Sequence, residues 1–149
     1  MICKNTESYR PITLSDTQRL YAIEKGSILT PWTDRDIALE LSAESGFHRA
    51  LCGETTVVAF CLARLTSAEL HIMHIATDEA FKRRGFGRHL LSELFKEAKM
   101  AGATKIFLEV ATNNRPALNL YASLEFVRDG VRKKYYASGE DAILMSLKV

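Results

Sequence analysis

The segment Thr77-Asp78-Glu79-Ala80-Phe81-Lys82-Arg83-Arg84-Gly85-Phe86-Gly87 joins the two elements around which this chain is arranged. Before it, residues 70–76 form an apolar run broken only by two histidines, which predicts a buried strand. After it, apolar residues recur at helical spacing from Phe86 to Ala98, and Gly102 follows, which predicts an amphipathic helix ending near residue 100. The sequence therefore predicts a basic, glycine-containing loop between a strand and a helix start.

This loop has the features of a phosphate or pyrophosphate site. Its glycines tolerate unusual backbone angles, and the helix start presents free N–H groups at the positive end of the helix dipole. Lys82, Arg83, Arg84 and Arg88 add positive charge. It is not a dinucleotide fingerprint, because Leu90 stands where the third glycine belongs, nor a nucleoside-triphosphate loop, because no Gly-Lys-Ser/Thr follows. A basic turn capped by glycines explains the same residues.

Composition narrows the class of protein. A chain of 149 residues predicts a single domain, residues 1–149, large enough to bury a core. The net charge of +2 is too small to indicate nucleic-acid binding, and no apolar run approaches the roughly 20 residues that span a membrane. Three scattered cysteines without a Cys-x-x-Cys pair are typical of a reducing compartment. We expect a cytoplasmic monomer that binds neither nucleic acid nor membrane.

The remaining elements predict an α/β fold. Strands are expected at residues 9–14, 47–52, 56–65, 70–77, 105–111, 126–136 and 142–148. Helices are expected after Ser15, after Thr33, in the segment ending near residue 100, and after Asn113 or Asn114. The strand–helix–strand unit over residues 70–111 should be a right-handed crossover with parallel strands. The result is a mixed sheet of six or seven strands with helices on both faces.

Two side chains are candidates for proton transfer. Glu109 ends the apolar run 106–108, and partial desolvation beside a buried strand makes a carboxylate a better base. Tyr121 lies at helical spacing with apolar neighbours, so it should be on the buried face of its helix. From spacing alone, a glutamate facing water and a core tyrosine with a bonded hydroxyl explain both residues as well.

No metal site is expected. His71 and His74 should lie on opposite faces of one strand and so cannot hold one ion together. His48 and His89 have no cysteine or carboxylate neighbours at metal-ligand spacing.

The loop and the strand before it resemble the acetyl-CoA site of the GNAT acetyltransferases. Lys82-x-x-Gly85-x-Gly87, following Ile75-Ala76-Thr77, is similar to the family's Gln/Arg-x-x-Gly-x-Gly/Ala loop, with lysine in the first position here. The resemblance implies that the strand edge pairs with the pantetheine amides through the backbone of Ile75, Ala76 and Thr77. It also implies that acetyl-CoA is the cosubstrate and that its pyrophosphate is bound by Lys82, Arg83, Arg84, Gly85, Phe86, Gly87 and Arg88.

A second segment resembles the RimI-type N-terminal acetyltransferases of that family. It reads Glu109-Val110, then Asn114, then Leu120-Tyr121-Ala122-Ser123-Leu124-Glu125-Phe126. The resemblance implies that Glu109 deprotonates the substrate amine through water, that Tyr121 protonates the departing thiolate, and that Asn114 and Tyr121 contact the cofactor. Glu125 replaces the family's usual glycine and should strain or remodel the helix exit if φ is positive there.

Two further motifs resemble the family's substrate slot. Tyr135-Tyr136-Ala137-Ser138-Gly139-Glu140-Asp141-Ala142 is similar to its last hairpin, and Pro31-Trp32-Thr33 to its loop between the first two helices. The resemblance implies that Trp32, Glu109, Tyr135 and Tyr136 bind the substrate. It predicts acetyl transfer to a protein N-terminus, namely the N-terminal alanine of a ribosomal small-subunit protein. The alternatives are acetylation of a small-molecule amine or a lysine side chain, and a non-catalytic acyl-CoA-binding module.

Overall fold

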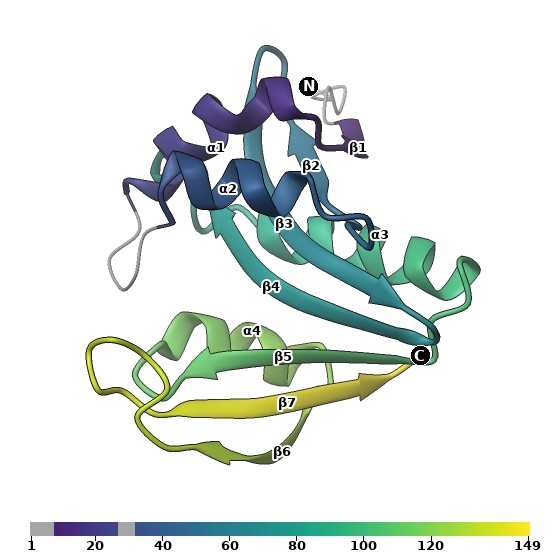
Figure 1. Cartoon of the computed structure of the whole chain (residues 1–149), viewed down its shortest axis with the longest axis vertical. Helices are drawn as coiled ribbons and strands as arrows, with labels where there is room; N and C mark the ends of the chain where they lie inside the picture. The colour runs from purple at the N-terminus through teal and green to yellow at the C-terminus, as the bar shows by residue number, and fades with distance from the viewer. Residues whose placement is uncertain (1–7, 27–31) are drawn as a thin grey trace.

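The computed structural model describes residues 8–26 and 32–149. Seven strands form one sheet in the order β1-β2-β3-β4-β5-β7-β6, and each neighbouring pair is antiparallel except β4 and β5 (Figure 1). The strands are β1 Ser8–Pro11, β2 Arg49–Cys52, β3 Val57–Thr66, β4 Glu69–Thr77, β5 Lys105–Ala111, β6 Val127–Arg132 and β7 Ala142–Lys148. The predicted mixed sheet with a parallel central pair is therefore confirmed.

Helices cover both faces of the sheet, as predicted. They are α1 Thr17–Glu24, α2 Asp34–Leu41, α3 Phe86–Met100 and α4 Arg115–Ser123. The core divides in two accordingly. Leu20 of α1 and Ile37 of α2 are fully buried against Phe60 of β3, whereas Leu91 and Leu94 of α3 belong to the larger cluster on the opposite face. The two helix pairs thus fix the sheet from both sides (Figure 1).

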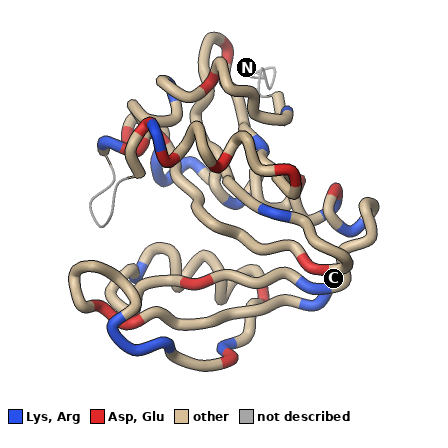
Figure 2. The backbone as a smooth tube through the Cα atoms, in the orientation of Figure 1, with Lys and Arg blue, Asp and Glu red and all other residues tan. Residues whose placement is uncertain are grey.

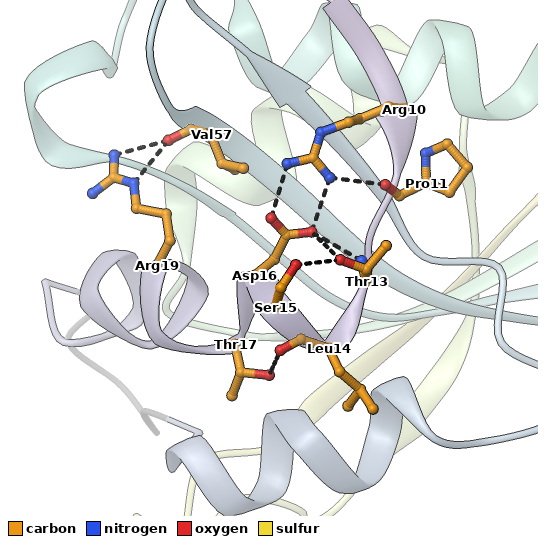
Figure 3. Close-up of polar contacts among 9 residues, drawn as sticks. All are labelled: Arg10, Pro11, Thr13, Leu14, Ser15, Asp16, Thr17, Arg19 and Val57. Carbon is orange, nitrogen blue, oxygen red and sulfur yellow. Dashed lines mark hydrogen bonds and ion pairs between the residues drawn. The ribbon is translucent and has the colours of Figure 1, made fainter.

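The connection from β1 to α1 differs from the prediction. The strand ends before residue 14, and a short 3-10 turn, η1 (Leu14–Asp16), precedes the helix. The Asp16 carboxylate fixes this turn, because it accepts two 2.8 Å hydrogen bonds from the Arg10 guanidinium and one of 2.9 Å from the Thr13 N–H (Figure 3). Ser15 was expected to cap α1, and that expectation is wrong: Asp16 occupies the N-cap position. The Asp16 side chain caps no N–H of α1; it holds the bidentate Arg10 guanidinium, which a hydroxyl cannot do.

The central parallel pair separates halfway along its length. β4 pairs with β5 only where residues 69–72 meet residues 105–108, and Figure 1 shows the two strands diverging beyond that point. Residues 74–77 of β4 still pair with β3 on their other side. Among the described strands, none pairs with this second edge of β4. The edge is therefore available for backbone hydrogen bonds to a ligand.

A β-bulge interrupts β4 at the point of divergence. His74 lies opposite Leu62 of β3, whereas Ile72 lies opposite the next residue, Ala63, so Met73 is the extra residue. One extra residue reverses the alternation of side chains beyond it.

The bulge overturns one prediction about the histidines. His71 stacks on Phe107, whose two neighbours in β5 belong to the core under α3, so both rings lie on the face away from α3. His74 contacts Phe60 and Trp32 in the cluster on the α1–α2 face. The two histidines therefore lie on the same face of the sheet, and the prediction of opposite faces is wrong. Within residues 8–26 and 32–149, no three His, Cys, Asp or Glu side chains are grouped so that they could hold a metal ion.

Helix α4 has the predicted start and an exit under strain. Asn114 is the N-cap, and its side-chain oxygen accepts the Ala117 N–H at 3.3 Å. At the other end Glu125 has φ +69°, while the Phe126 N–H donates to the Tyr121 carbonyl at 3.0 Å. This is the bond pattern of a Schellman exit, which normally takes glycine. The chain keeps the exit geometry with glutamate and accepts the strained backbone.

Candidate active site

Side chains outside the glycines fix the start of the loop from β4 to α3. Asp78 caps a short 3-10 turn, η2 (Glu79–Phe81), by accepting the Ala80 N–H at 2.9 Å. Arg19 of α1 forms an ion pair with Asp78. The Arg19 guanidinium also donates two hydrogen bonds to the Val57 carbonyl of β3, at 2.8 and 3.1 Å (Figure 3). The hydrogen bond from the Ala80 N–H lowers the pKa of Asp78 most, and the hydrogen bond and charge of Arg19 lower it further. The start of the loop is therefore tied to the sheet.

The backbone of this loop presents a row of unused donors. Gly85, with φ +80°, is the N-cap of α3, and Arg83 also has a positive φ of +63°. The first helical bond runs from the His89 N–H to the Gly85 carbonyl at 3.0 Å. The N–H groups of residues 83–88 have no acceptor among the described residues. Donors in this arrangement at a helix start bind phosphate, so the loop fits the pyrophosphate of acetyl-CoA.

The basic side chains of the loop are not equivalent. Lys82 pairs with Glu79 at 2.8 Å, Arg84 lies over the ring of Phe81, and Arg88 donates to the Ser123 hydroxyl of α4 at 2.5 Å. Arg83, in contrast, has no ion pair, hydrogen bond or ring contact with another described residue. Of the four predicted cations, Arg83 is thus the one most available to a phosphate.

Gly87 and Phe86 shape the helix start. A Cβ at Gly87 would lie 3.5 Å from the Thr77 hydroxyl oxygen, an ordinary contact that the fold tolerates. The Phe86 ring packs edge-on against Phe81 at 5.9 Å and so anchors the loop to the core. The glycine is therefore suited to close approach by a ligand rather than required by packing inside the protein.

Glu109 projects from β5 on the face away from α3, beyond the point where β4 and β5 part. Its carboxylate oxygen lies 3.3 Å from the Arg132 guanidinium of β6, and its side chain is 31% exposed. Hydrogen bonding to Glu109 raises the pKa of Tyr135, and the Arg132 guanidinium lies 5.1 Å from the Tyr135 ring. Burial and the Glu109 charge raise the pKa of Tyr136 to about 12. The structure therefore brings three predicted site residues, Glu109, Tyr135 and Tyr136, together.

The hairpin that carries the two tyrosines is shorter than expected and fixed by acids. β6 ends at Arg132 rather than at residue 136, because Lys134 turns the chain with φ +51°. The Lys134 N–H donates to the Asp141 carboxylate at 2.9 Å, and the Thr112 hydroxyl donates to Glu140 at 3.2 Å. Figure 2 shows the basic stretch of this connection beside the acidic pair that precedes β7. The two acids therefore hold the shape of the hairpin.

Tyr121 is a core residue with one accessible atom. It is 4% exposed and packs against Phe126 with ring centroids 5.6 Å apart. Its hydroxyl has no hydrogen-bond partner among the described residues, and it is not one of the fully buried polar atoms that lack a partner, since the described residues contain none. The hydroxyl oxygen is therefore the part of the ring that reaches solvent. Burial raises the pKa of Tyr121, so the phenol remains protonated near neutral pH and can give up a proton.

Asn114 and Trp32 have structural partners as well as free surface. The side-chain oxygen of Asn114 caps α4, which leaves its NH₂ group to donate elsewhere. The Trp32 ring stacks on His74 at 5.5 Å, and its backbone N–H donates to Glu24 at 3.3 Å. Pro31, the other half of the Pro-Trp motif, lies outside the described residues. The sequence did not predict the hydrogen bond between Nε2 of His74 and the Glu24 carboxylate, which are 2.5 Å apart, because the residues lie 50 positions apart and no motif links them.

Comparison with known proteins identifies the family. The model of the acetyltransferase (GNAT) family matches residues 13–126. The [Ribosomal protein bS18]-alanine N-acetyltransferase of Salmonella typhimurium is 30% identical over 93% of this chain and 95% of its own. The N-alpha-acetyltransferase RimI of Mycobacterium tuberculosis is 33% identical over 90% of this chain and 87% of its own.

A solved structure agrees in fold. The crystal structure of the ribosomal-protein-S18-alanine N-acetyltransferase from Escherichia coli superimposes with a TM-score of 0.89 at 30% identity, covering 96% of this chain and 94% of that one. The predicted resemblance in sequence and the predicted fold are both confirmed. The chain therefore belongs to the acetyl-CoA-dependent GNAT acetyltransferases.

Proposed function

We propose that this chain transfers the acetyl group of acetyl-CoA to the N-terminal α-amine of a protein, namely the N-terminal alanine of a ribosomal small-subunit protein. One observation carries the proposal: Glu109 lies beside the tyrosine pair of the β6–β7 connection, where β5 has parted from β4. A base thus lies between the open edge of β4 and the side chains that would receive a peptide. The names of the relatives from Salmonella typhimurium and Escherichia coli support the same substrate.

Each site residue has a role in this proposal. The backbone of Ile75, Ala76 and Thr77 pairs with the pantetheine amides, because this edge of β4 has no strand partner in the described part of the chain. The pyrophosphate is held by the free N–H groups of residues 83–88, with charge from Lys82, Arg83, Arg84 and Arg88. The NH₂ group of Asn114 is a further donor to the cofactor.

The chemistry falls to two residues. Glu109 takes a proton from the substrate amine through water, which makes the nitrogen nucleophilic. Tyr121 gives its proton to the sulfur as the thioester breaks, a role that fits its protonated state and its accessible hydroxyl. Trp32, Tyr135 and Tyr136 form the walls that hold the first residues of the substrate.

We further propose that the chain acts as a cytoplasmic monomer of one domain. Its partner is a protein N-terminus, with no direct contact to nucleic acid or membrane. No helix in the described part of the chain is long and apolar enough to cross a bilayer.

The proposal is tested by mass spectrometry of intact ribosomal proteins from cells with and without this gene. One small-subunit protein is expected to lose the mass of one acetyl group at its N-terminus when the gene is deleted. The native gene should restore the acetylated form, and a gene encoding Glu109→Gln should not. Small-subunit proteins with unchanged N-terminal masses in the deleted strain would refute the assignment.

A further inference from the structure

Acetylation of a protonated α-amine removes two protons from its nitrogen. The ammonium nitrogen loses one proton before it attacks the thioester and a second when the new amide becomes neutral. One of these protons ends on the CoA sulfur and the other in solvent. Glu109 accounts for one acceptor, so the site has chemical use for another.

A buried carboxylate that is hydrogen-bonded to a histidine lies outside the residues assigned so far. Glu24 of α1 is fully buried, and its carboxylate is 2.5 Å from Nε2 of His74. The same carboxylate accepts the Trp32 N–H at 3.3 Å. A carboxylate buried this deeply needs such partners, because an unpaired charge in the interior is costly.

The geometry leaves the other nitrogen of His74 free. With Nε2 directed at Glu24, Nδ1 has no hydrogen-bond partner in the described part of the chain. It is not fully buried either, because none of the described residues has a fully buried side-chain nitrogen or oxygen without a partner. The ring is held in place by stacking on Trp32 and by Phe60, while the side chain remains 20% exposed. An imidazole oriented by a carboxylate through one nitrogen, with the other open, is the arrangement of a general base.

The β-bulge decides where this base points. In a regular strand without the bulge, His74 would share the face of Leu70 and Ile72 and point to the core under α3; with the bulge, the ring lies on the α1–α2 side. Glu109 also projects away from α3, because it alternates in β5 with Leu108 and Val110 of the α3 cluster. His74 and Glu109 are thus on the same face of the sheet, on the two strands that part at this point.

We propose that His74, oriented by the buried carboxylate of Glu24, is a second proton acceptor for the substrate α-amine. The inference rests on the proposed function. Glu109 takes the first proton from the ammonium group through water, the freed amine forms the bond to the acetyl carbon, and the carbon–sulfur bond breaks. Neutral His74 takes the second proton from nitrogen at Nδ1 and becomes an imidazolium paired with Glu24.

The protons then balance through groups already in the site. Tyr121 protonates the thiolate and recovers a proton from Glu109 through water, while His74 releases its proton to solvent. Among the described residues that contact the His74 ring, Glu24 of α1 is the titratable one, and Trp32 carries no charge. Phe60 and Leu62 of β3, which also neighbour the ring, carry no charge. The reaction therefore uses two acceptors for the protons on nitrogen, Glu109 and His74.

The test measures kcat against pH at saturating acetyl-CoA and saturating alanine-initiated peptide without lysine. In the native enzyme the acidic limb should reach a slope of two at its low-pH end, where both acceptors are protonated. His74→Gln keeps a donor to Glu24 but is not basic, so kcat should drop on the order of 10²-fold and the slope should become one. The affinity for CoA, measured by calorimetry, should stay the same. Glu24→Gln keeps the imidazole, so it should lower kcat less and leave the slope at two.

The outcomes separate the inference from the proposed function. A folded His74→Gln enzyme with the native rate and slope would overturn the inference, while inactivity of Glu109→Gln would leave the proposed function standing. If His74→Gln does not fold, a native rate in Glu24→Gln overturns the orienting role on which the inference depends. A native enzyme that acetylates no α-amine overturns both.

Discussion

Replacing Glu125 with glycine should stabilise this protein. Glu125 has φ +69° at the exit of α4, in the left-handed region that disfavours residues with a Cβ by about 1–2 kcal/mol. Glycine removes that strain but gives the unfolded chain more freedom, worth about 0.5–1 kcal/mol. The two hydrogen bonds of the exit, from Glu125 to the Ala122 carbonyl and from Phe126 to the Tyr121 carbonyl, are made by the backbone and remain. The expected net gain is about 0.5–1 kcal/mol.

Urea and thermal denaturation measure this gain. A gain of 1 kcal/mol should raise the thermal midpoint of a chain of this size by about 2–4 °C. Glu125→Ala is the matched control, because it removes the charge and keeps the Cβ. It should leave stability close to native. If Glu125→Gly is no more stable than Glu125→Ala, the strain assigned to the backbone at this position is refuted.

Three further changes test the site and its frame. Gly87→Val should abolish binding of acetyl-CoA and CoA alike in calorimetry without unfolding the protein, and unchanged affinity would remove the loop from the site. Tyr121→Phe should slow turnover and leave CoA affinity unchanged. Stability should change little, since the hydroxyl has no hydrogen bond to lose within the described residues. A native rate across the pH range would show that Tyr121 is not the proton donor. Asp16→Asn should destabilise the fold by about 1 kcal/mol at pH 7, a figure reduced for the partly exposed Arg10. Arg10 lowers the pKa of Asp16 below 3.8, so its contribution is full above that pH and is lost as pH falls through the folded value; equal denaturation midpoints at pH 7 would contradict this.

Much of the fold follows from local pattern. The period of the apolar residues predicts the strands and helices, and the motif order predicts the parallel pair and the site on its open edge. What the pattern misses depends on contacts between distant residues. The start of α1 moved from Ser15 to Asp16 because a 3-10 turn closed on Thr13 precedes the helix, and Arg10 of β1 holds the Asp16 carboxylate in that turn.

The candidate site also contains residues that local patterns predict and residues that depend on distant contacts. Glu109, Tyr135 and Tyr136 were expected together, and the structure places them so. His74 was assigned to the wrong face relative to His71, because strict alternation does not anticipate a bulge, and the extra residue Met73 is specified by pairing with β3. Local sequence patterns therefore do not predict the contact of His74 with Glu24.

The central claim is that the acceptor is an α-amine. A peptide α-amine has a pKa near 7.7–8.0 and a lysine ε-amine near 10.4, so at neutral pH deprotonating lysine costs roughly 3.5 kcal/mol more, at about 1.36 kcal/mol per pKa unit. A carboxylate such as Glu109 should meet the smaller demand far more easily.

The most direct measurement compares kcat/KM for two peptides of identical sequence apart from the acceptor. One has a free N-terminal alanine and no lysine, and the other has a blocked N-terminus and one lysine. The proposed function predicts acetylation of the first, with kcat/KM larger by on the order of 10²-fold or more, as the cost difference implies. Comparable values for the two peptides would contradict the N-terminal assignment and favour a lysine or small-molecule amine as the substrate.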